Sequence, residues 1–176
     1  MKIQICKFLL GTIGKILPLR RHPGGGIANR IRCLFVKGIV DKMGANCIVE
    51  PGAEVLEGCV LGDRTSIGPH CMVGPKCVFK GHNMMGPNVH IYTTNHIYDE
   101  ANHKFSGITA PNSVTIGEYV WLGYGVIVLP GVTIGDHVII GAGSVVTKDI
   151  PSGVMAAGNP CVVKKVIDAK YYEEND

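Results

Sequence analysis

The chain has 176 residues, which is long enough for one domain with a hydrophobic core of its own. Glycine accounts for 24 residues and aromatic side chains for only 6%, a composition that disfavours a globule built around large aromatic residues. The net charge is +3 without a nucleic-acid recognition motif beside it, which argues against a nucleic-acid-binding protein.

The positive charge is concentrated near the N-terminus. Residues 1–46 contain nine Lys or Arg residues and one acid, Asp41, for a local charge of +8, whereas residues 47–176 have a charge of −5. A basic segment of this kind favours contact with an anionic partner.

Residues 1–21 are predicted to form an amphipathic helix. Four apolar residues recur there at helical spacing: Ile5, Leu9, Ile13 and Ile16. Lys7 and Lys15 interrupt the segment, which makes it a poor signal peptide and too short an apolar run to span a membrane. Two interpretations stay open. The helix packs on the rest of the fold or on a neighbouring subunit, or it makes a peripheral contact with an anionic membrane.

A second helical stretch follows a break at residues 22–26, where a Pro and three Gly stand together. It is predicted over 27–43, with Gly44 available to cap its end. Residues 1–46 are therefore assigned to a basic helical N-terminal segment.

From residue 47 onwards, every sixth residue is apolar. The first run is Val55, Leu61, Ile67, Val73, Phe79, Met85 and Ile91, and the second is Ile116, Leu122, Val128, Ile134, Ile140 and Val146. Neither the 3.6-residue period of a helix nor the alternation of a flat strand gives a period of six. The repeat predicts a parallel β-helix over 47–163, a solenoid whose coils share one core, followed by a short helical tail over 164–176.

Two further columns of residues support the repeat. The residue after the apolar one is Gly at positions 62, 68, 74, 86, 117, 123, 135 and 141, which suggests tight corners whose backbone angles exclude a Cβ. Small or β-branched residues stand four places after the apolar one, among them Cys59, Cys71 and Cys77. The seven Cys form no CxxC or zinc-binding spacing, so we interpret them as reduced thiols in a cytoplasmic protein.

The repeat is interrupted between Ile91 and Ile116, whose separation is not a multiple of six. Residues 92–113 are therefore predicted to leave the solenoid as an extruded loop, and loops on a rigid scaffold often carry functional residues. The loop contains His96, with Asp99 three residues later. Alone, this pair indicates either a catalytic base with an orienting carboxylate or an ordinary surface histidine.

Taken together, the rungs, the TTNHIYD loop and the stretch from VTIGEYVWLGYG to GAGSVVTKDIPSGVMAAGNP resemble the left-handed β-helix (hexapeptide-repeat) acyltransferases. The similarity covers about residues 47–166. It is strongest to the maltose/galactoside O-acetyltransferase branch and to capsular polysaccharide acetyltransferases. The resemblance implies an all-β, left-handed parallel β-helix that forms a homotrimer, with acetyl-CoA in a groove between adjacent solenoids.

The resemblance also implies roles for individual residues. His96 matches the general base that removes the acceptor hydroxyl proton, a role that suits imidazole near neutral pH, and Asp99 is the candidate orienting group. The acetyl-CoA groove is expected to be lined by Trp121, Tyr124, Ala142, Thr147, Lys148 and Lys165. The two lysines would offset phosphate charge. No metal is required in this mechanism.

The predicted function is acetyl-CoA-dependent O-acetylation of a saccharide hydroxyl. Residues 66–70 lack the Asn with which sugar-specific members hold the acceptor, and residues 1–40 lack their acidic residue. The basic, apolar N-terminus instead favours a surface polysaccharide or its lipid-linked or nucleotide-linked precursor. The expected location is the cytoplasm, at the inner face of the membrane if residues 1–21 contact it.

Three alternatives remain at this stage. The same base could serve an N-acetyltransferase of an amino sugar or an antibiotic acetyltransferase. A zinc enzyme resembling the γ-type carbonic anhydrases would use histidines such as His90 and His96, which lie six residues apart. A non-catalytic solenoid would serve as a binding platform.

Overall fold

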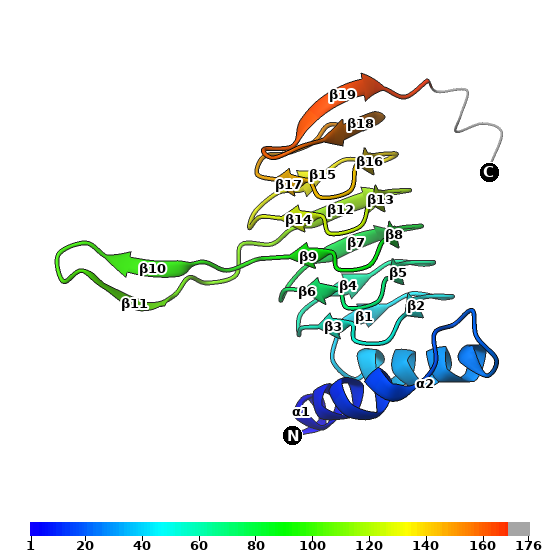
Figure 1. Cartoon of the computed structure of the whole chain (residues 1–176). Helices are drawn as coiled ribbons and strands as arrows, with labels where there is room; N and C mark the ends of the chain where they lie inside the picture. Colours follow the sequence, from blue (N-terminus) through cyan, green and yellow to red (C-terminus); the bar gives the residue numbers. More distant parts are fainter. Residues whose placement is uncertain (169–176) are drawn as a thin grey trace.

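The structure, a computed structural model, is described for residues 1–168. Figure 1 shows a tall stack of short strands with helices at one end and a β-hairpin that projects sideways from the middle. No helix within residues 1–168 has the length and apolar character that crossing a membrane requires.

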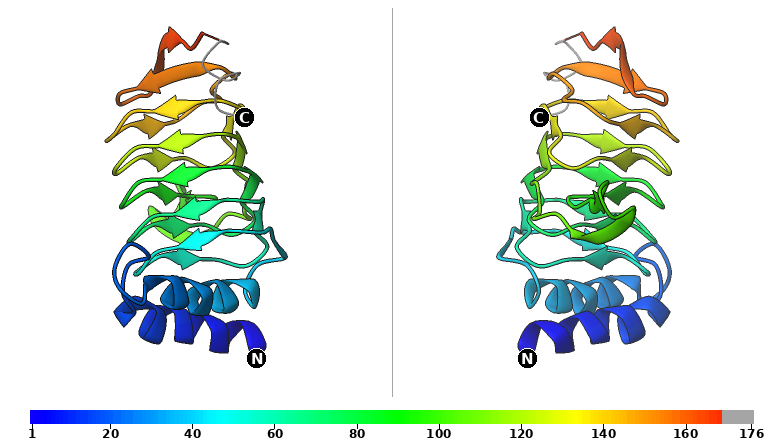
Figure 2. Two further views of the ribbon diagram at one scale, coloured as in Figure 1. Left: turned by 90° about the vertical axis from the view of Figure 1, so that its right-hand side faces the viewer. Right: turned by 90° about the vertical axis from the view of Figure 1, so that its left-hand side faces the viewer.

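Two helices lie beneath the first coil, as Figure 2 shows from two sides. The first helix consists of α1 (Lys2–Leu9) and the π-helical η1 (Leu10–Gly14), and the second helix is α2 (Gly25–Lys37). The predicted end of the second helix at residue 43 is wrong. The helix ends at Lys37, with Gly38 at its C-cap, because Lys42–Met43 already form the first strand, β1, of the solenoid.

The stack consists of three parallel ladders. Sheet A contains β1, β4 (Val60–Leu61), β7 (Val78–Gly81), β12 (Thr115–Glu118) and β15 (Thr133–Ile134). Sheet B begins with β2 (Ile48–Val49), β5 (Ser66–Ile67), β8 (Met84–Met85), β13 (Trp121–Leu122) and β16 (Ile139–Ile140). Sheet C contains β3 (Glu54–Val55), β6 (Met72–Val73), β9 (His90–Ile91), β14 (Ile127–Val128) and β17 (Val145–Val146).

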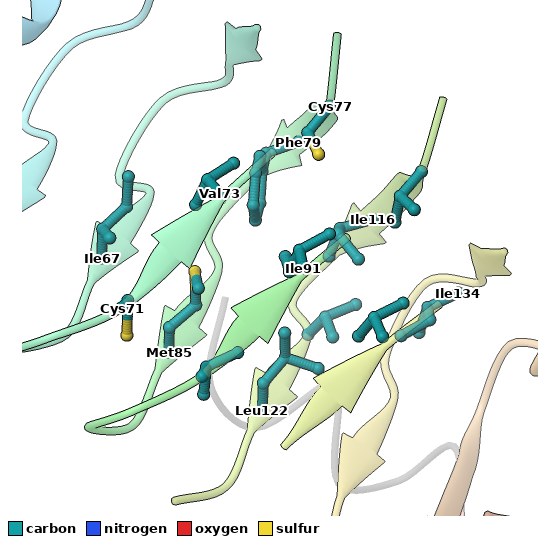
Figure 3. Packing of buried hydrophobic residues seen from close by; sticks show 14 of the residues in the cluster. Ile67, Cys71, Val73, Cys77, Phe79, Met85, Ile91, Ile116, Leu122 and Ile134 are labelled. Atoms are coloured by element: carbon teal, nitrogen blue, oxygen red, sulfur yellow. The ribbon is translucent and has the colours of Figure 1, made fainter. Parts of the chain in front are cut away.

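The register confirms the six-residue repeat. Met43 lies beside Leu61, and Leu61 lies beside Phe79, so one coil takes three hexapeptides. Every predicted rung residue is buried, and Figure 3 shows several of them stacked inside the prism. The thiols of Cys59, Cys71 and Cys77 are also buried in this core. Burial raises the pKa of Cys71 to about 11, which keeps this thiol protonated and unreactive at neutral pH.

The glycine column has a different cause from the one that the sequence suggested. None of its members has a positive φ. They are needed because the next coil passes close by: a Cβ on Gly123 would lie 2.7 Å from the amide nitrogen of Ala142. The left-handed backbone instead occurs at the corners two residues later, for example at Arg64 (φ 54°) and His70 (φ 56°).

Two other expectations need correction. The extruded segment is an antiparallel hairpin of β10 (His96–Asp99) and β11 (Lys104–Ile108), and so is more ordered than the predicted loop. The tail is not helical where it is described. The strands β18 (Val154–Ala157) and β19 (Val162–Val166) close sheet B, and β19 runs antiparallel to β18. The last eight residues of the predicted tail, 169–176, lie outside the described part of the chain.

The rung residues should dominate the stability of the fold. Replacing Ile134, which is 0% exposed, with Ala should lower the free energy of unfolding by ~2–5 kcal/mol, because the core cannot close over the cavity. Denaturant titration followed by circular dichroism measures this change. The matched variant Ile16→Ala, at a side chain that is 83% exposed, should change stability by less than ~0.5 kcal/mol. Equal losses in the two variants would contradict the assignment of the core.

Candidate active site

The projecting hairpin is fixed to the solenoid at its base. The amide of Asn112 donates to the carbonyl of Thr93 (2.7 Å), and the amide of Gly131 donates to the carbonyl of Asn112 (3.2 Å). The Ser113 hydroxyl donates to the carbonyl of Lys76 (2.6 Å). The first bond joins the two ends of the hairpin segment, and the other two connect its C-terminal end to the coils above and below it. The hairpin therefore leaves the solenoid from a defined position.

The first pair of residues beyond the base closes the neck of the hairpin. Asn95 donates its amide hydrogen to the Thr109 hydroxyl (3.0 Å), and the amide of Thr109 donates back to the carbonyl of Asn95 (2.8 Å). His96 follows directly and pairs with Ile108 in the register of the hairpin. Its backbone is therefore held by the neck, although its side chain is exposed.

One aromatic side chain, Phe105, lies against the His96 ring. The ring of Phe105 lies edge-on to His96, with centroids 5.8 Å apart, and also edge-on to Tyr98, at 5.5 Å. Phe105 thus restricts the rotation of the imidazole from one side. The His96 residue is exposed, as a proton acceptor for an external hydroxyl requires.

Asp99 lies at the tip of the hairpin, where its carboxylate is hydrogen-bonded to Asn102. Its carboxylate accepts hydrogen bonds from the side-chain amide of Asn102 (2.8 Å) and from the Asn102 backbone (3.2 Å). These bonds lower the pKa of Asp99. Strand alternation places Asp99 on the face opposite to His96. The role of Asp99 as the orienting group stays a prediction, and this hairpin geometry favours a turn-forming role instead.

His90 and His96 do not stack on each other. His90 belongs to sheet C, and its Nδ1 lies 3.4 Å from the Tyr92 hydroxyl, whereas His96 belongs to the hairpin. Within residues 1–168, no group of three or more His, Cys, Asp or Glu side chains is arranged to hold a metal ion.

Four of the predicted cofactor residues lie along sheet B and the corner at which the chain enters sheet C. Trp121 faces outward from sheet B between Met84 and Ile139 and is 47% exposed. Tyr124 and Ala142 are exposed at neighbouring corners, where the carbonyl of Tyr124 accepts the amide of Gly143 (2.8 Å). Lys165 lies exposed in β19, at the end of the same sheet.

The other two predicted cofactor residues lie at the opposite edge of sheet C. Thr147 and Lys148 are exposed at the corner that follows β17. The hairpin leaves from the same column of corners after β9, two coils closer to the N-terminus. Since coils stack at ~4.8 Å, about 10 Å along the axis separates the two levels. Within one chain, the base of the hairpin therefore lies on the edge that carries Thr147 and Lys148, and not on the edge that carries Tyr124 and Ala142.

Two residues that shape the site were not expected from the sequence. Phe105 contacts the His96 ring, and Asn112 joins the other end of the hairpin segment, at Thr93, to the next coil, at Gly131. A signal for the hairpin exists in the sequence, since the strand-like runs HIYD and KFSGI are separated by only four residues. The contact made by Asn112 depends on tertiary register and has no such signal.

Comparison with known proteins agrees with this architecture. The family model "Bacterial transferase hexapeptide (six repeats)" matches residues 42–75 and 113–148, on either side of the hairpin. The chain is 40% identical over 150 residues to a galactoside O-acetyltransferase of Lactococcus lactis, covering 81% of this chain and 70% of that protein.

Solved structures are similar over almost the whole chain. A maltose O-acetyltransferase from Clostridium difficile has a TM-score of 0.70 and 32% identity, covering 95% of this chain and 87% of that one. A galactoside acetyltransferase in complex with coenzyme A has a TM-score of 0.75 and 28% identity, covering 97% and 84%. The chain therefore belongs to the hexapeptide-repeat acetyltransferases, in the branch that contains the galactoside and maltose O-acetyltransferases.

Proposed function

We propose that this acetyl-CoA-dependent O-acetyltransferase modifies a hydroxyl of a saccharide, namely a surface polysaccharide or its precursor, with His96 as the general base. The observation that carries the proposal is the exposed imidazole of His96 on a hairpin whose base is hydrogen-bonded to the solenoid and whose neck is closed by hydrogen bonds between its own two strands. The relatives named for galactoside and maltose acetylation support a saccharide acceptor.

In the proposed reaction, a ring nitrogen of His96 takes the hydroxyl proton while the acceptor oxygen attacks the thioester carbonyl. A carbon–oxygen bond forms, and the carbon–sulfur bond then breaks. The imidazolium returns its proton to the departing thiolate, so that protons and charges balance. Phe105, against one edge of the ring, would limit the orientations of the imidazole and so position its nitrogen.

The roles of the groove residues follow from their positions. Lys148 and Lys165 are exposed cations that would offset the phosphate charges of the coenzyme. Trp121, with Tyr124 and Ala142 at the neighbouring corner, offers an apolar surface for the pantetheine arm. Thr147 would contact the coenzyme from the edge of sheet C on which the hairpin lies.

A homotrimer is part of the proposal because one chain divides the groove residues between two edges of sheet C. A neighbouring solenoid would bring the Trp121 edge of one chain next to the His96 edge of another. Exposed apolar side chains on the hairpin support a protein contact: Ile97, Tyr98, Phe105 and Ile108. The assembled protein is proposed to work in the cytoplasm, and the basic N-terminal segment favours an acceptor that carries phosphate, such as a nucleotide-linked or lipid-linked sugar.

Two histidine variants test whether His96 is the general base. His96→Ala should lower kcat by about 10²–10⁴-fold, because no other group takes the proton, while the affinity for acetyl-CoA stays within a few-fold of wild type. Transfer of labelled acetyl to an active acceptor and coenzyme-induced thermal shift give the two readouts.

The matched control is His103→Ala, at the tip of the same hairpin. It should keep near wild-type kcat. Full activity of His96→Ala, or an equal loss in both variants, would rule out His96 as the base.

The trimer is tested by charging the hairpin. Phe105 is 70% exposed in the single chain, so Phe105→Asp should leave the protomer folded but bury an unpaired charge in the subunit contact. Light scattering after gel filtration should show a trimer for the wild type and a smaller species for the variant. Val166→Asp, at an equally exposed apolar residue of β19, should remain trimeric. A wild-type monomer with full activity would contradict the proposed assembly.

A further inference from the structure

The helical base of the solenoid presents an apolar surface to solvent. We use "helical base" for α1, η1 and α2, which form the N-terminal end of the stack in Figure 2. No residue of α1 is buried. The exposed large apolar residues of this base are Met1, Ile3, Ile5, Phe8, Ile13, Ile16, Ile27 and Leu34. Phe8 is 68% exposed and Leu34 is 67% exposed, and apolar residues gathered at one end of a molecule indicate an interaction surface.

Both helices of the base are amphipathic, and each leaves apolar residues exposed. In α2 the residues Ala28, Arg32 and Val36 face the first coil and are buried, whereas Ile27, Leu34 and Lys37 lie exposed on the outer side. In α1 the outer stripe contains Ile5 and Phe8 at helical spacing. The sequence alone indicated this property only for residues 1–21, and the fold adds α2 to it.

Basic side chains surround the apolar residues. Six are exposed: Lys2, Lys15, Arg20, Arg21, Arg30 and Lys37. The ion pairs found among residues 1–168 are Lys7–Glu57, Arg32–Glu50 and Lys80–Asp136, and none of the six takes part in them. Asp41 is the single acid in residues 1–46, so the charge of this segment is not neutralised from within.

A basic groove lies beside α2. It has a volume of about 540 Å³ and is bordered on one side by Arg30, Leu34 and Lys37 and on the other by the first coil at Met43 and Ile48. Arg20 completes its cationic lining, which contains no carboxylate. A groove with this lining matches a phosphate group attached to an apolar chain.

Polar contacts hold the helical base against the first coil, and they do not involve the side chains of the six exposed basic residues. The buried Arg32 donates from Nη1 to the carbonyls of Leu17 (3.2 Å) and Pro18 (3.1 Å), and from Nε to the carbonyl of Val49 (2.5 Å). Lys7 of α1 forms an ion pair with Glu57 in the corner of the first coil. The helices therefore present a preformed surface, which lowers the entropic cost of docking.

We propose that the helical base docks the protein on the surface of an anionic phospholipid bilayer. The apolar stripe would enter the interface between headgroups and acyl chains, the six basic residues would contact lipid phosphates, and the groove beside α2 would hold one headgroup phosphate. The contact is peripheral. The N-terminal end of the solenoid lies at the membrane surface, and the rest of the stack extends away from it.

Charge decides between a bilayer and a second copy of the chain as the occupant. Two copies placed base to base would bring two sets of six exposed basic residues together, which costs free energy at physiological salt. An anionic bilayer neutralises the same charge. The apolar residues and the basic residues then both gain from one partner.

Vesicle flotation with the full chain tests the proposal. The protein should float with vesicles of phosphatidylcholine and phosphatidylglycerol at low salt, should float much less at about 0.5 M NaCl, and should not float with phosphatidylcholine alone. The double variant Arg30→Gln/Lys37→Gln should bind about 30-fold more weakly, since each basic residue near the surface contributes ~1 kcal/mol. Phe8→Gln should bind at least about tenfold more weakly.

The matched controls lie at the other end of the stack. Lys164→Gln and Val166→Gln remove one exposed cation and one exposed apolar residue of β19, and vesicle binding should not change. Circular dichroism confirms that every variant is folded. Equal binding to both kinds of vesicle, no binding to either, or an equal loss in the controls would overturn the proposal. A base that serves as a protein contact instead would show as a change of molar mass in Phe8→Gln without vesicle binding by the wild type, which also overturns it.

Discussion

The stacking of coils at one fixed spacing is the constraint on which the rest of the structure depends. Phe79 pairs with Ile116 and Ile91 pairs with Val128, so the ladders continue across the hairpin as if nothing had been inserted. An insertion is tolerated only if both of its ends meet at one corner. That condition is met by an antiparallel hairpin, and it explains why His96 projects from the solenoid without disturbing a single rung. The rigidity of the hairpin base and the exposure of the imidazole both follow from this meeting of the two ends at one corner.

The chemistry follows from where the corners lie. Each coil offers three corners, and the same corner repeats above and below itself, so side chains distant in sequence form vertical columns. Thr147 and Lys148 share a column with the hairpin, whereas Tyr124 and Ala142 share the column across sheet C. A long, narrow cosubstrate suits such columns because it can extend along the axis. The proposed pairing of two chains joins the columns without any change inside either solenoid.

Much of the fold was predictable because its physical cause is local. The period of the apolar residues identified the rungs from Val55 to Val146, all of them buried, but not the buried rung at Val49. The broken period located the excursion at residues 92–113. The prediction was less accurate where contacts between neighbouring coils determine the local structure. The glycine column reflects the backbone of the neighbouring coil at Ala142, and the early end of α2 reflects the pairing of Lys42 with Val60. At the site, His96 was identifiable by resemblance, but its contact with Phe105 needed the register of the hairpin.

The reversal of the last strand has a consequence for solubility. A solenoid has no intrinsic length limit, because its final coil leaves open amide and carbonyl groups that a further coil would satisfy. In this chain β19 runs antiparallel on β18 and sets Lys164 and Lys165 along the outer rim, while α2 covers the opposite opening. Both ends of the stack are thus covered. Coils of one chain are therefore kept from stacking end to end on the coils of another chain to form a fibre.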